Sequence, residues 1–296
     1  MTSVETLPQV LGNAEFIARF DNNSPEWLEL RSRGIGGSEV STIVGLNKWE
    51  SAVTMFYKRT GKIATERPDS EPMYWGRALE APIMNRFIED NPQLKVYTDV
   101  GTWINRKRDY QIVNPDGIFE TEDGEFGIVE IKTARYPDDW ANGVPDYYRT
   151  QVQYYMNAFG FQHAYVAVLF SGSDYRCYEL AADSFQQSVD LERVEDFLAA
   201  VKENKAPDWD GSDSTLETVR KLHPTIEDNE VEIGALYEEY AAARRDITTY
   251  TEDLNRLKGQ ILDKMGNAKK ATFNGQHVLS RQAKGQGIPF LVEKRG

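Results

Sequence analysis

The chain has 296 residues, of which 40% are hydrophobic and 11% aromatic, so it is long enough to bury a sizeable core. Its one cysteine, Cys177, excludes disulfides within the chain and iron–sulfur sites built from four cysteines, and we expect a core thiol. No apolar run is long enough to span a membrane, and residues 1–9 have neither a basic start nor a hydrophobic stretch for export. We therefore expect a cytoplasmic globular protein.

The net charge of −13 by itself argues against a nucleic-acid partner. The charge is unevenly distributed, however. Residues 181–240 hold 5 basic and 16 acidic side chains, whereas residues 241–296 hold 11 basic and 5 acidic ones. Because a locally positive segment can attract phosphate, the net charge does not exclude DNA.

A glycine-rich turn near the N-terminus precedes a predicted helix at 39–44. Gly37 frees the backbone and Ser38 is a favourable N-cap residue, so amide groups and a positive helix end converge near Arg31 and Arg33. This pattern predicts a phosphate-binding corner. The alternative is a helix cap without a ligand.

A second helix is predicted to begin near 77–79, because proline is tolerated only in the first turn of a helix and Pro82 follows. Glu80 then lies in that first turn, where its carboxylate either interacts with the helix dipole or belongs to a site. Strands follow at 94–104 and 110–113.

The turn between these two strands holds Arg106 and Arg108, which either contact DNA or are solvated.

The central pattern is an Asn-Pro-Asp-Gly turn at 114–117 that leads through a polar hairpin to the run 127–132. Alternation along this run puts Glu130 and Lys132 on one face of an apolar strand, where an unpaired charge is costly. Asp116 can meet Glu130 once the two strands pair. Two carboxylates are ligands that Mg²⁺ prefers, and a lysine beside them suits hydrolysis of a phosphodiester. A surface hairpin with solvated or paired charges is the alternative.

A helix at 147–159 carries Gln151 and Tyr155 four residues apart on one face. They either orient a water or phosphate oxygen or border the core. With the predicted strands at 164–170 and 175–180, the order of elements indicates an α/β sandwich with its site at the strand ends.

The C-terminal region differs in pattern. Apolar residues keep heptad spacing over 233–261, which predicts a helix on the order of 50 Å long with one narrow seam, ended by Gly266. Asn274 and Gly275 form a favourable hairpin turn. We therefore expect a core at 1–224, a long helix at 225–266 and a basic β-hairpin tail at 267–296.

Five motifs, in order and spacing, resemble the phage lambda exonuclease and YqaJ viral recombinase family of PD-(D/E)xK nucleases. They lie at 27–39, 75–80, 114–117, 130–132 and 151–155. Each motif is loose alone, but five in register are specific. The resemblance covers roughly 25–180 and implies a restriction-endonuclease-like fold, a mixed central sheet flanked by helices.

This resemblance implies a Mg²⁺-dependent 5′-to-3′ exonuclease, with Mn²⁺ as a substitute and no nucleotide cofactor, which leaves 3′ single-stranded tails for phage-type recombination. It assigns Asp116, Glu130 and Glu80, with the carbonyl of Ile131, to the metal, and Lys132 to catalysis with support from Gln151 and Tyr155. It assigns Arg31 and Ser38 to the 5′-phosphate. Arg33, Gly37, Arg106 and Arg108 are further candidate DNA contacts.

The partners implied are double-stranded DNA ends, other copies of the chain in a trimeric ring, and a phage-type single-strand annealing protein, with no membrane. Two alternatives remain open. One is an endonuclease or repair nuclease of the same fold, and the other is a DNA-end-binding module that does not cut.

Overall fold

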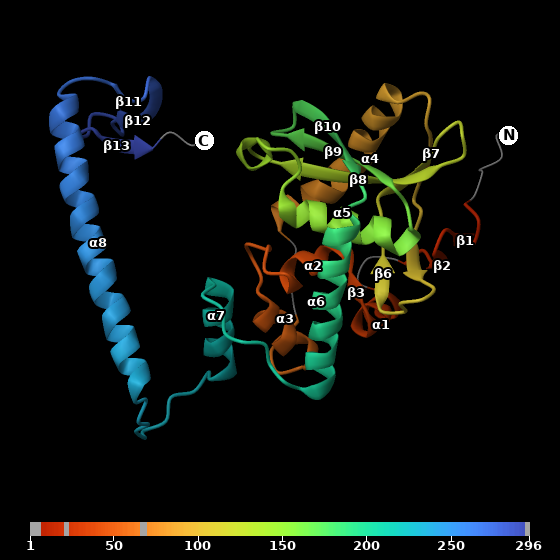
Figure 1. Cartoon of the computed structure of the whole chain (residues 1–296), viewed down its shortest axis with the longest axis horizontal. Coiled ribbons are helices and arrows are strands. Elements are labelled where there is room, and N and C mark those ends of the chain that lie inside the picture. The colour runs from red at the N-terminus through yellow and green to blue at the C-terminus, as the bar shows by residue number, and fades with distance from the viewer. Residues whose placement is uncertain (1–6, 21–23, 66–69, 294–296) are drawn as a thin grey trace. The chain divides into compact units, whose positions relative to one another are not determined.

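The computed structural model describes residues 7–20, 24–65 and 70–293. Residues 1–9, for which we expected no export signal, therefore lie partly outside the described residues. The chain forms two compact units, Met1–Pro224 and Thr225–Gly296 (Figure 1). Among the described residues, no helix combines the length and the apolar character needed to cross a membrane.

Two five-stranded sheets form the frame of the first unit. One has the order β10-β9-β8-β7-β4, and its strands are β4 (Lys95–Thr98), β7 (Gly117–Glu120), β8 (Phe126–Ala134), β9 (His163–Phe170) and β10 (Asp174–Ala181). The other has the order β1-β2-β5-β6-β3, and its strands are β1 (Val10–Leu11), β2 (Ala14–Ala18), β3 (Ile35–Gly36), β5 (Thr102–Asn105) and β6 (Gln111–Val113).

Strand β8 is central to the first of these sheets. It pairs in parallel with β9 and antiparallel with β7, which makes the sheet mixed. Seven helices and a 3-10 turn surround the two sheets within the described part of this unit: α1 (Pro25–Arg33), α2 (Gly37–Ile43), α3 (Ala52–Arg59), α4 (Glu71–Asp90), η1 (Asp138–Trp140), α5 (Asp146–Phe159), α6 (Ser184–Glu203) and α7 (Asp213–Leu222). The predicted α/β fold with a mixed central sheet and flanking helices is confirmed.

The alternating side chains of β8 enter two different cores. Val129 and Ile131 pack with Ile83, Met84 and Phe87 of α4. On the other face, Ile128 joins the larger core together with residues of α5, which lies across this sheet in Figure 1. Glu130 and Lys132 share the face of Ile128 and therefore point toward α5, because successive side chains of a strand alternate.

The predicted strand at 94–104 is in fact two strands, β4 and β5, which belong to different sheets. The chain turns between them through two left-handed residues, Asp99 at φ 50° and Gly101 at φ 72°. A left-handed conformation ends a strand, because it rotates the following backbone groups out of the ladder.

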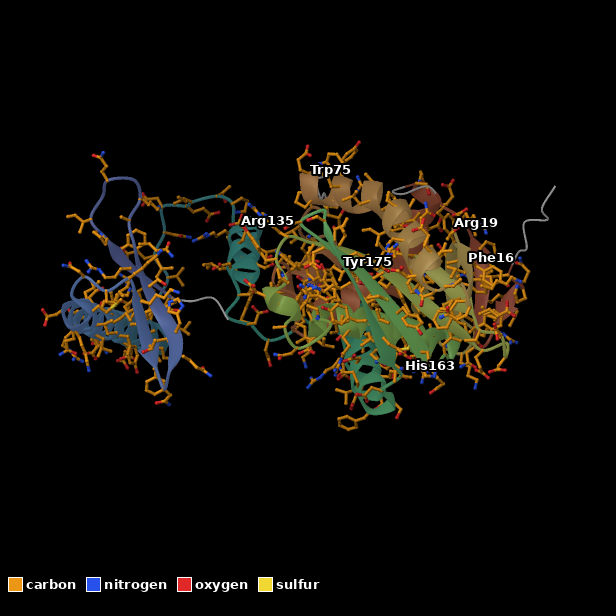
Figure 2. The ribbon with its side chains drawn as sticks, turned by 90° about the horizontal axis from the view of Figure 1, so that it is seen from above. Phe16, Arg19, Trp75, Arg135, His163 and Tyr175 are labelled. Atoms are coloured by element: carbon orange, nitrogen blue, oxygen red, sulfur yellow. The ribbon has the colours of Figure 1, made fainter. Side chains whose placement is uncertain are left out.

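The predicted start of α4 was wrong. The helix begins at Glu71, with Pro72 in its first turn, and Pro82 lies inside it. The half before Pro82, where Trp75 is labelled in Figure 2, buries no side chain, whereas Ile83 and Phe87 beyond it are buried. Burial of such side chains, about 1.5–3 kcal/mol each, offsets the cost of an internal proline, about 3 kcal/mol. Glu80 therefore lies in mid-helix, and the helix dipole does not explain it.

The expectation of a core thiol was also wrong, since Cys177 is exposed. It lies on β10, which is the last strand of its sheet and has no buried residue.

The second unit consists of one long helix and a small sheet. Helix α8 spans Ala235–Met265 and ends at Gly266, as predicted, and none of its side chains is buried. The predicted start at 225 was wrong, because residues 225–234 are not helical and Gly234, at φ 55°, is the N-cap. The predicted hairpin is β11 (Lys270–Phe273) with β12 (Gln276–Gln282), joined through Asn274 and Gly275, both at positive φ. A third strand, β13 (Phe290–Glu293), extends the hairpin and was not predicted.

Gly127 of β8 is closely packed against the neighbouring strands β7 and β9, and a substitution there measures how tight this packing is. A Cβ there would lie 2.2 Å from a ring carbon of Phe119 and 2.5 Å from the backbone oxygen of His163. We therefore expect Gly127→Ala to lower the free energy of unfolding by about 1–3 kcal/mol, as over-packing of a core does. Urea denaturation followed by tryptophan fluorescence measures this change.

The matched control is Gly211→Ala, because nothing lies within 4 Å of a Cβ at Gly211. Equal unfolding midpoints for the two variants would contradict the tight packing of β8.

Candidate active site

The β7–β8 hairpin brings Asp116 and Glu130 together. Gly117 pairs with Val129, and this register sets Asp116, one residue earlier, against Glu130. Asp116 Oδ2 accepts a hydrogen bond of 2.7 Å from the amide of Ile131. Lys132 Nζ lies 2.5 Å from Glu130 Oε1. Two carboxylates and one ammonium group therefore share this end of the hairpin.

Helix α5 supplies the polar neighbours of this group. Gln151 Nε2 donates to Glu130 Oε1 at 2.7 Å and to the Tyr155 hydroxyl at 3.0 Å, while Gln151 Oε1 accepts from Lys132 Nζ at 3.2 Å. Lys132 Nζ also lies 4.9 Å from the ring centroid of Tyr148. The network fixes Glu130 and Lys132 relative to each other, because Gln151 bonds to both.

Burial dominates the electrostatics of the carboxylates. It raises the pKa of Glu130 to about 8, helped by the nearby charge of Asp116. It likewise raises the pKa of Glu80 to about 7, again with a contribution from Asp116. Burial raises the pKa of Asp116 too, although Lys132 and the Ile131 amide oppose this. One lysine thus faces three carboxyl groups that are poorly solvated as anions.

Lys132 keeps its proton in this environment. Burial alone lowers the pKa of its ammonium group, but the charges of Glu130 and Asp116 raise it by more, and the resulting pKa is above the usual value. The pKa shift therefore favours the charged form of Lys132 beside the carboxyl groups.

The donor set fits a hard divalent cation. Glu130 is 2% exposed, and its Oε2 is buried without a hydrogen-bond partner among the described residues. Such an oxygen is costly unless it is paired or coordinates a metal, and carboxylate oxygens are the ligands that Mg²⁺ prefers. Among the described residues, no group of three or more His, Cys, Asp or Glu side chains is already arranged to hold a metal ion. Asp116 accepts a hydrogen bond from the Ile131 amide, and Glu130 accepts one from Lys132.

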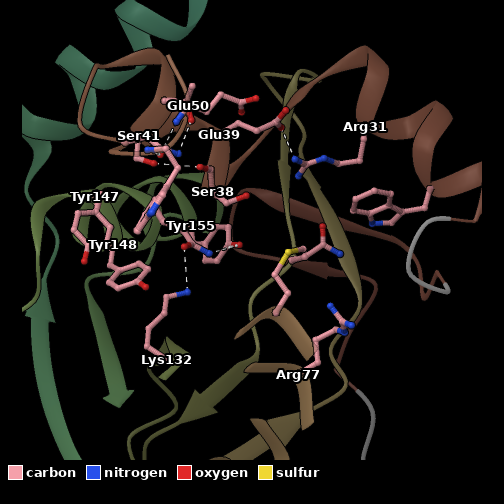
Figure 3. Close-up of a pocket in the computed structure, with 17 residues that line it drawn as sticks. Arg31, Ser38, Glu39, Ser41, Glu50, Arg77, Lys132, Tyr147, Tyr148 and Tyr155 are labelled. Carbon is pink, nitrogen blue, oxygen red and sulfur yellow. Dashed lines mark hydrogen bonds and ion pairs between the residues drawn. The ribbon is translucent and has the colours of Figure 1, made fainter. Parts of the chain in front are cut away.

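A cavity of about 820 Å³ adjoins this network (Figure 3). Lys132, Gln151 and Tyr155 line it, and so do Arg31 of α1 and Ser38 of α2. The fold therefore brings residues from widely separated parts of the sequence around one space. Asp116, Glu130 and Glu80 lie outside the cavity lining.

The Arg31 corner is organised by a residue that sequence reasoning missed, Glu39. Its carboxylate contacts the Arg31 guanidinium, lies 2.7 Å from Arg59 and accepts from the Gly36 amide at 2.8 Å. Two guanidinium groups share one carboxylate, so this corner keeps a net positive charge. The signal was present in the sequence, since a Glu three residues after an N-cap indicates a capping box.

Ser38 is not the N-cap of α2, which is Gly36. Glu39 bonds back to the N-cap amide and so fixes the helix start two residues earlier than expected. Gly37 is required for close packing, because a Cβ there would lie 2.3 Å from the Tyr155 ring.

Three predicted DNA contacts do not reach the cavity. Arg33 pairs with Glu29 on the exposed side of α1, since residues two apart on a helix do not face the same way. Arg108 lies 3.8 Å from Glu195 of α6, and Arg106 is exposed on the turn after β5.

Aromatic side chains at the cavity were also missed. Trp49 packs edge-on against Tyr147 with ring centroids 5.8 Å apart, and Tyr147 lies 4.4 Å from Tyr148. Trp27 lines the cavity near Arg31, and its ring lies 5.3 Å from that guanidinium. Trp49 is 65% exposed on the loop between α2 and α3, where no periodic pattern marks it.

Comparisons with known proteins agree with this architecture. Residues 26–162 match the model of the YqaJ-like viral recombinase domain. The chain is 29% identical over 270 residues to the uncharacterized protein YqaJ of Bacillus subtilis (strain 168), covering 86% of this chain and 83% of that protein. The family resemblance predicted from the five motifs is confirmed.

Two solved structures show the same fold. The crystal structure of an alkaline exonuclease (LHK-Exo) from Laribacter hongkongensis aligns with a TM-score of 0.50, and that of LHK-Exo in complex with dAMP aligns with 0.51. Each is 20% identical, and each alignment covers 62% of this chain and 94% of the other.

The raised carboxyl pKa values predict how a metal ion affects stability. A carboxyl group whose folded pKa exceeds its unfolded value contributes stability below the unfolded pKa and loses it as pH rises through the folded pKa. For Glu80 and Glu130 this loss begins near the unfolded pKa of 4.5 and is complete above about pH 7 and about pH 8, respectively. The metal-free protein should therefore have a lower Tm at about pH 9 than at about pH 6, and Mg²⁺ or Mn²⁺ should raise Tm more at the higher pH.

Thermal unfolding with the metal or with EDTA at both pH values measures this effect. Glu130→Gln should abolish most of the metal-induced rise, while Glu122→Gln, a change at an exposed residue, should preserve it. The same rise in Tm at both pH values would contradict the assignment.

Proposed function

We propose that this protein is a metal-dependent DNA exonuclease that shortens the 5′ strand of double-stranded ends and leaves 3′ tails for recombination. The observation that carries the proposal is the buried network of Asp116, Glu130 and Lys132 beside a cavity with Arg31 at its far side. Similarity to the YqaJ-like viral recombinase domain and to an alkaline exonuclease supports this reaction class.

Asp116 and Glu130 would hold Mg²⁺ or Mn²⁺, with Glu80 and the carbonyl of Ile131 as further ligands. When bound, the ion would supply Lewis-acid activation of water and of the scissile phosphate. Its charge would also offset the repulsion among the three carboxylates, whose pKa values are raised by burial.

Hydrolysis adds water to phosphorus and breaks the bond to the 3′ oxygen, so a 5′-mononucleotide leaves. Negative charge grows on the phosphate oxygens in the transition state. Lys132 retains its proton and lines the cavity, so its ammonium group can stabilise that charge. LHK-Exo has been crystallised with dAMP, which is a nucleotide of the kind that such a reaction releases.

Gln151 and Tyr155 act as positioning residues. Gln151 bonds to both Glu130 and Lys132 and so keeps the ammonium group from rotating away. Tyr155 holds Gln151 through its hydroxyl, and burial raises the pKa of that hydroxyl well above its usual value.

The far side of the cavity would receive the terminal 5′-phosphate. Arg31 and Arg59 share Glu39, so their combined charge remains positive, and the Ser38 side chain lines the same space. A phosphate there can accept charge-assisted hydrogen bonds from the Arg31 guanidinium. Trp49 and Tyr147 at the rim offer faces on which bases can stack.

A ring of several copies around duplex DNA and a single-strand annealing partner are further proposals, and both are based on the family resemblance alone. Degradation of linear duplexes with no cutting of covalently closed circles distinguishes the exonuclease from an endonuclease or a repair nuclease. Cleavage of any kind excludes a module that only binds DNA ends.

Three substitutions test the chemistry. Asp116→Asn, Glu130→Gln and Lys132→Ala should each lower the cleavage rate of a linear duplex at least ~10²-fold, because each removes charge that the transition state or the metal requires. Binding to duplex ends, measured by fluorescence anisotropy in Ca²⁺, should change little.

Lys205→Ala, at an exposed residue remote from the cavity lining, should cut at the wild-type rate. A near wild-type rate for any of the three site variants would remove that residue from the mechanism.

The end preference tests the Arg31 corner. Arg31→Ala should reduce the preference for 5′-phosphorylated over 5′-hydroxyl ends by about 10- to 100-fold, since a charge-assisted hydrogen bond is lost. The matched control is Arg33→Ala, because Arg33 lies on the same helix but pairs with Glu29 outside the cavity. Digestion rates of the two duplexes measure the preference, and an unchanged ratio for Arg31→Ala would place the phosphate elsewhere.

A further inference from the structure

Helix α8 carries an apolar seam that its own unit leaves open. In heptad positions, a is occupied by Tyr240, Ile247, Leu254 and Ile261, and d by Leu236, Ala243, Tyr250 and Leu257. The large seam residues from Leu236 to Leu257 are between 46% and 73% exposed, and no side chain of α8 is buried. A narrow apolar seam of this regularity is the pattern of a helix that packs against one other helix.

The two helices that precede α8 in the chain, α6 and α7, do not offer a matching seam. The apolar stripe of α6, with Leu191, Val194 and Phe197, is already buried in the core of the first unit. Helix α7 buries Thr215 and Thr218, which belong to a hydroxyl network with α3. The partner of α8 must therefore bring an apolar seam of its own.

The charges beside the seam identify that partner. Between Leu236 and Ile261 the g positions are Glu239, Asp246, Asp253 and Gln260, and the e positions are Tyr237, Arg244, Thr251 and Lys258. In a parallel pair of identical helices, each g residue faces the e residue five positions later on the partner, which matches Glu239 with Arg244 and Asp253 with Lys258. In an antiparallel pair, g faces g and e faces e, so like charges meet.

Residues five apart do not face each other on one helix, so this complementarity does not stabilise α8 alone. Within the single chain, Asp253 pairs instead with Arg256, three residues later, at 3.0 Å. No such pair within the described residues of α8 involves Glu239 and Arg244, and these two residues carry the clearest test.

We propose that α8 pairs in parallel with α8 of a second copy of this chain, as a two-stranded coiled coil. Two of the four a positions hold Ile (Ile247 and Ile261) and two of the four d positions hold Leu (Leu236 and Leu257), which is the combination that favours two strands. Parallel pairing brings the N-terminal ends of both helices together. The segments that join each α8 to residues 1–224 of its own chain then start from the same end of the coiled coil. This raises the effective concentration of one 1–224 unit around the other.

Cysteine cross-linking of the full-length protein tests the direction. Cys177 is exposed and is first replaced by Ser, so that it does not form disulfides. In that background, Leu236→Cys and Leu257→Cys should each form a disulfide-linked dimer alone, because parallel helices place identical seam residues opposite each other. Non-reducing electrophoresis after mild oxidation should show several-fold more dimer than for Glu252→Cys, which lies on the opposite face of α8.

An antiparallel pair would behave differently, since the two leucines lie ~30 Å apart along the helix. It would yield linked dimer only when the two cysteine variants are mixed. That result, or yields equal to the Glu252→Cys control, would overturn the proposal.

Charge exchange provides an independent measurement. Glu239→Arg and Arg244→Glu should each weaken self-association by roughly threefold or more, whereas the double variant should restore it, because the pair is re-formed with its signs exchanged. Light scattering over a concentration series measures the association of the full-length chain. Helix content by circular dichroism checks that α8 still forms, and a double variant no better than the singles would contradict parallel pairing.

Discussion

The fold of the first unit depends on how the buried carboxylate of Glu130 is stabilised. Glu130 lies in the middle of a central strand and is 2% exposed, which is a costly position for an anion. Lys132 and Gln151 both bond to one of its oxygens, and the other has no hydrogen-bond partner in the part of the chain that the structure describes. Replacing a buried ion pair by well-packed apolar residues is often neutral or stabilising, so stability alone does not account for this arrangement. Coordination of a cation, as proposed above, would account for the unpaired oxygen.

The two-sided packing of β8 allows the sheet to tolerate these charges. Val129 and Ile131 anchor one face against α4, so the strand is held in place without help from its other face. That other face can then give two of its positions to charged residues, with α5 supplying Gln151 and Tyr155 to satisfy them. Apolar packing and the charged network thus lie on opposite sides of one strand, and the alternation of residue types along the sequence produces this division.

Local patterns predicted which charged residues lie together better than they predicted the shape of the site. Alternation and strand pairing were enough to bring Asp116, Glu130 and Lys132 together. The position of α4 was missed, because a rule about proline took no account of the buried side chains that hold the helix beyond Pro82. Trp49 could not be predicted as part of the cavity, since it lies on a loop and reaches Tyr147 only through the packing of distant segments. The spacing of residues along the chain predicts which of them share one side of a helix or strand. It does not predict which sides pack against each other in the fold.

The two units differ in how their charged residues are compensated. In the first unit the charged site residues are compensated within the chain, by Lys132 for the carboxylates and by Glu39 for two guanidinium groups. In α8 the spacing of Glu239 and Arg244 leaves them without such compensation in one helix, and the seam beside them is exposed. The charges beside the α8 seam are complementary between two parallel copies of the helix, whereas antiparallel pairing sets like charges against each other. Such a surface specifies both the partner and its direction. The heptad pattern is therefore the basis for the proposed pairing of two chains, whereas the motifs of the first unit are the basis for the proposed active site.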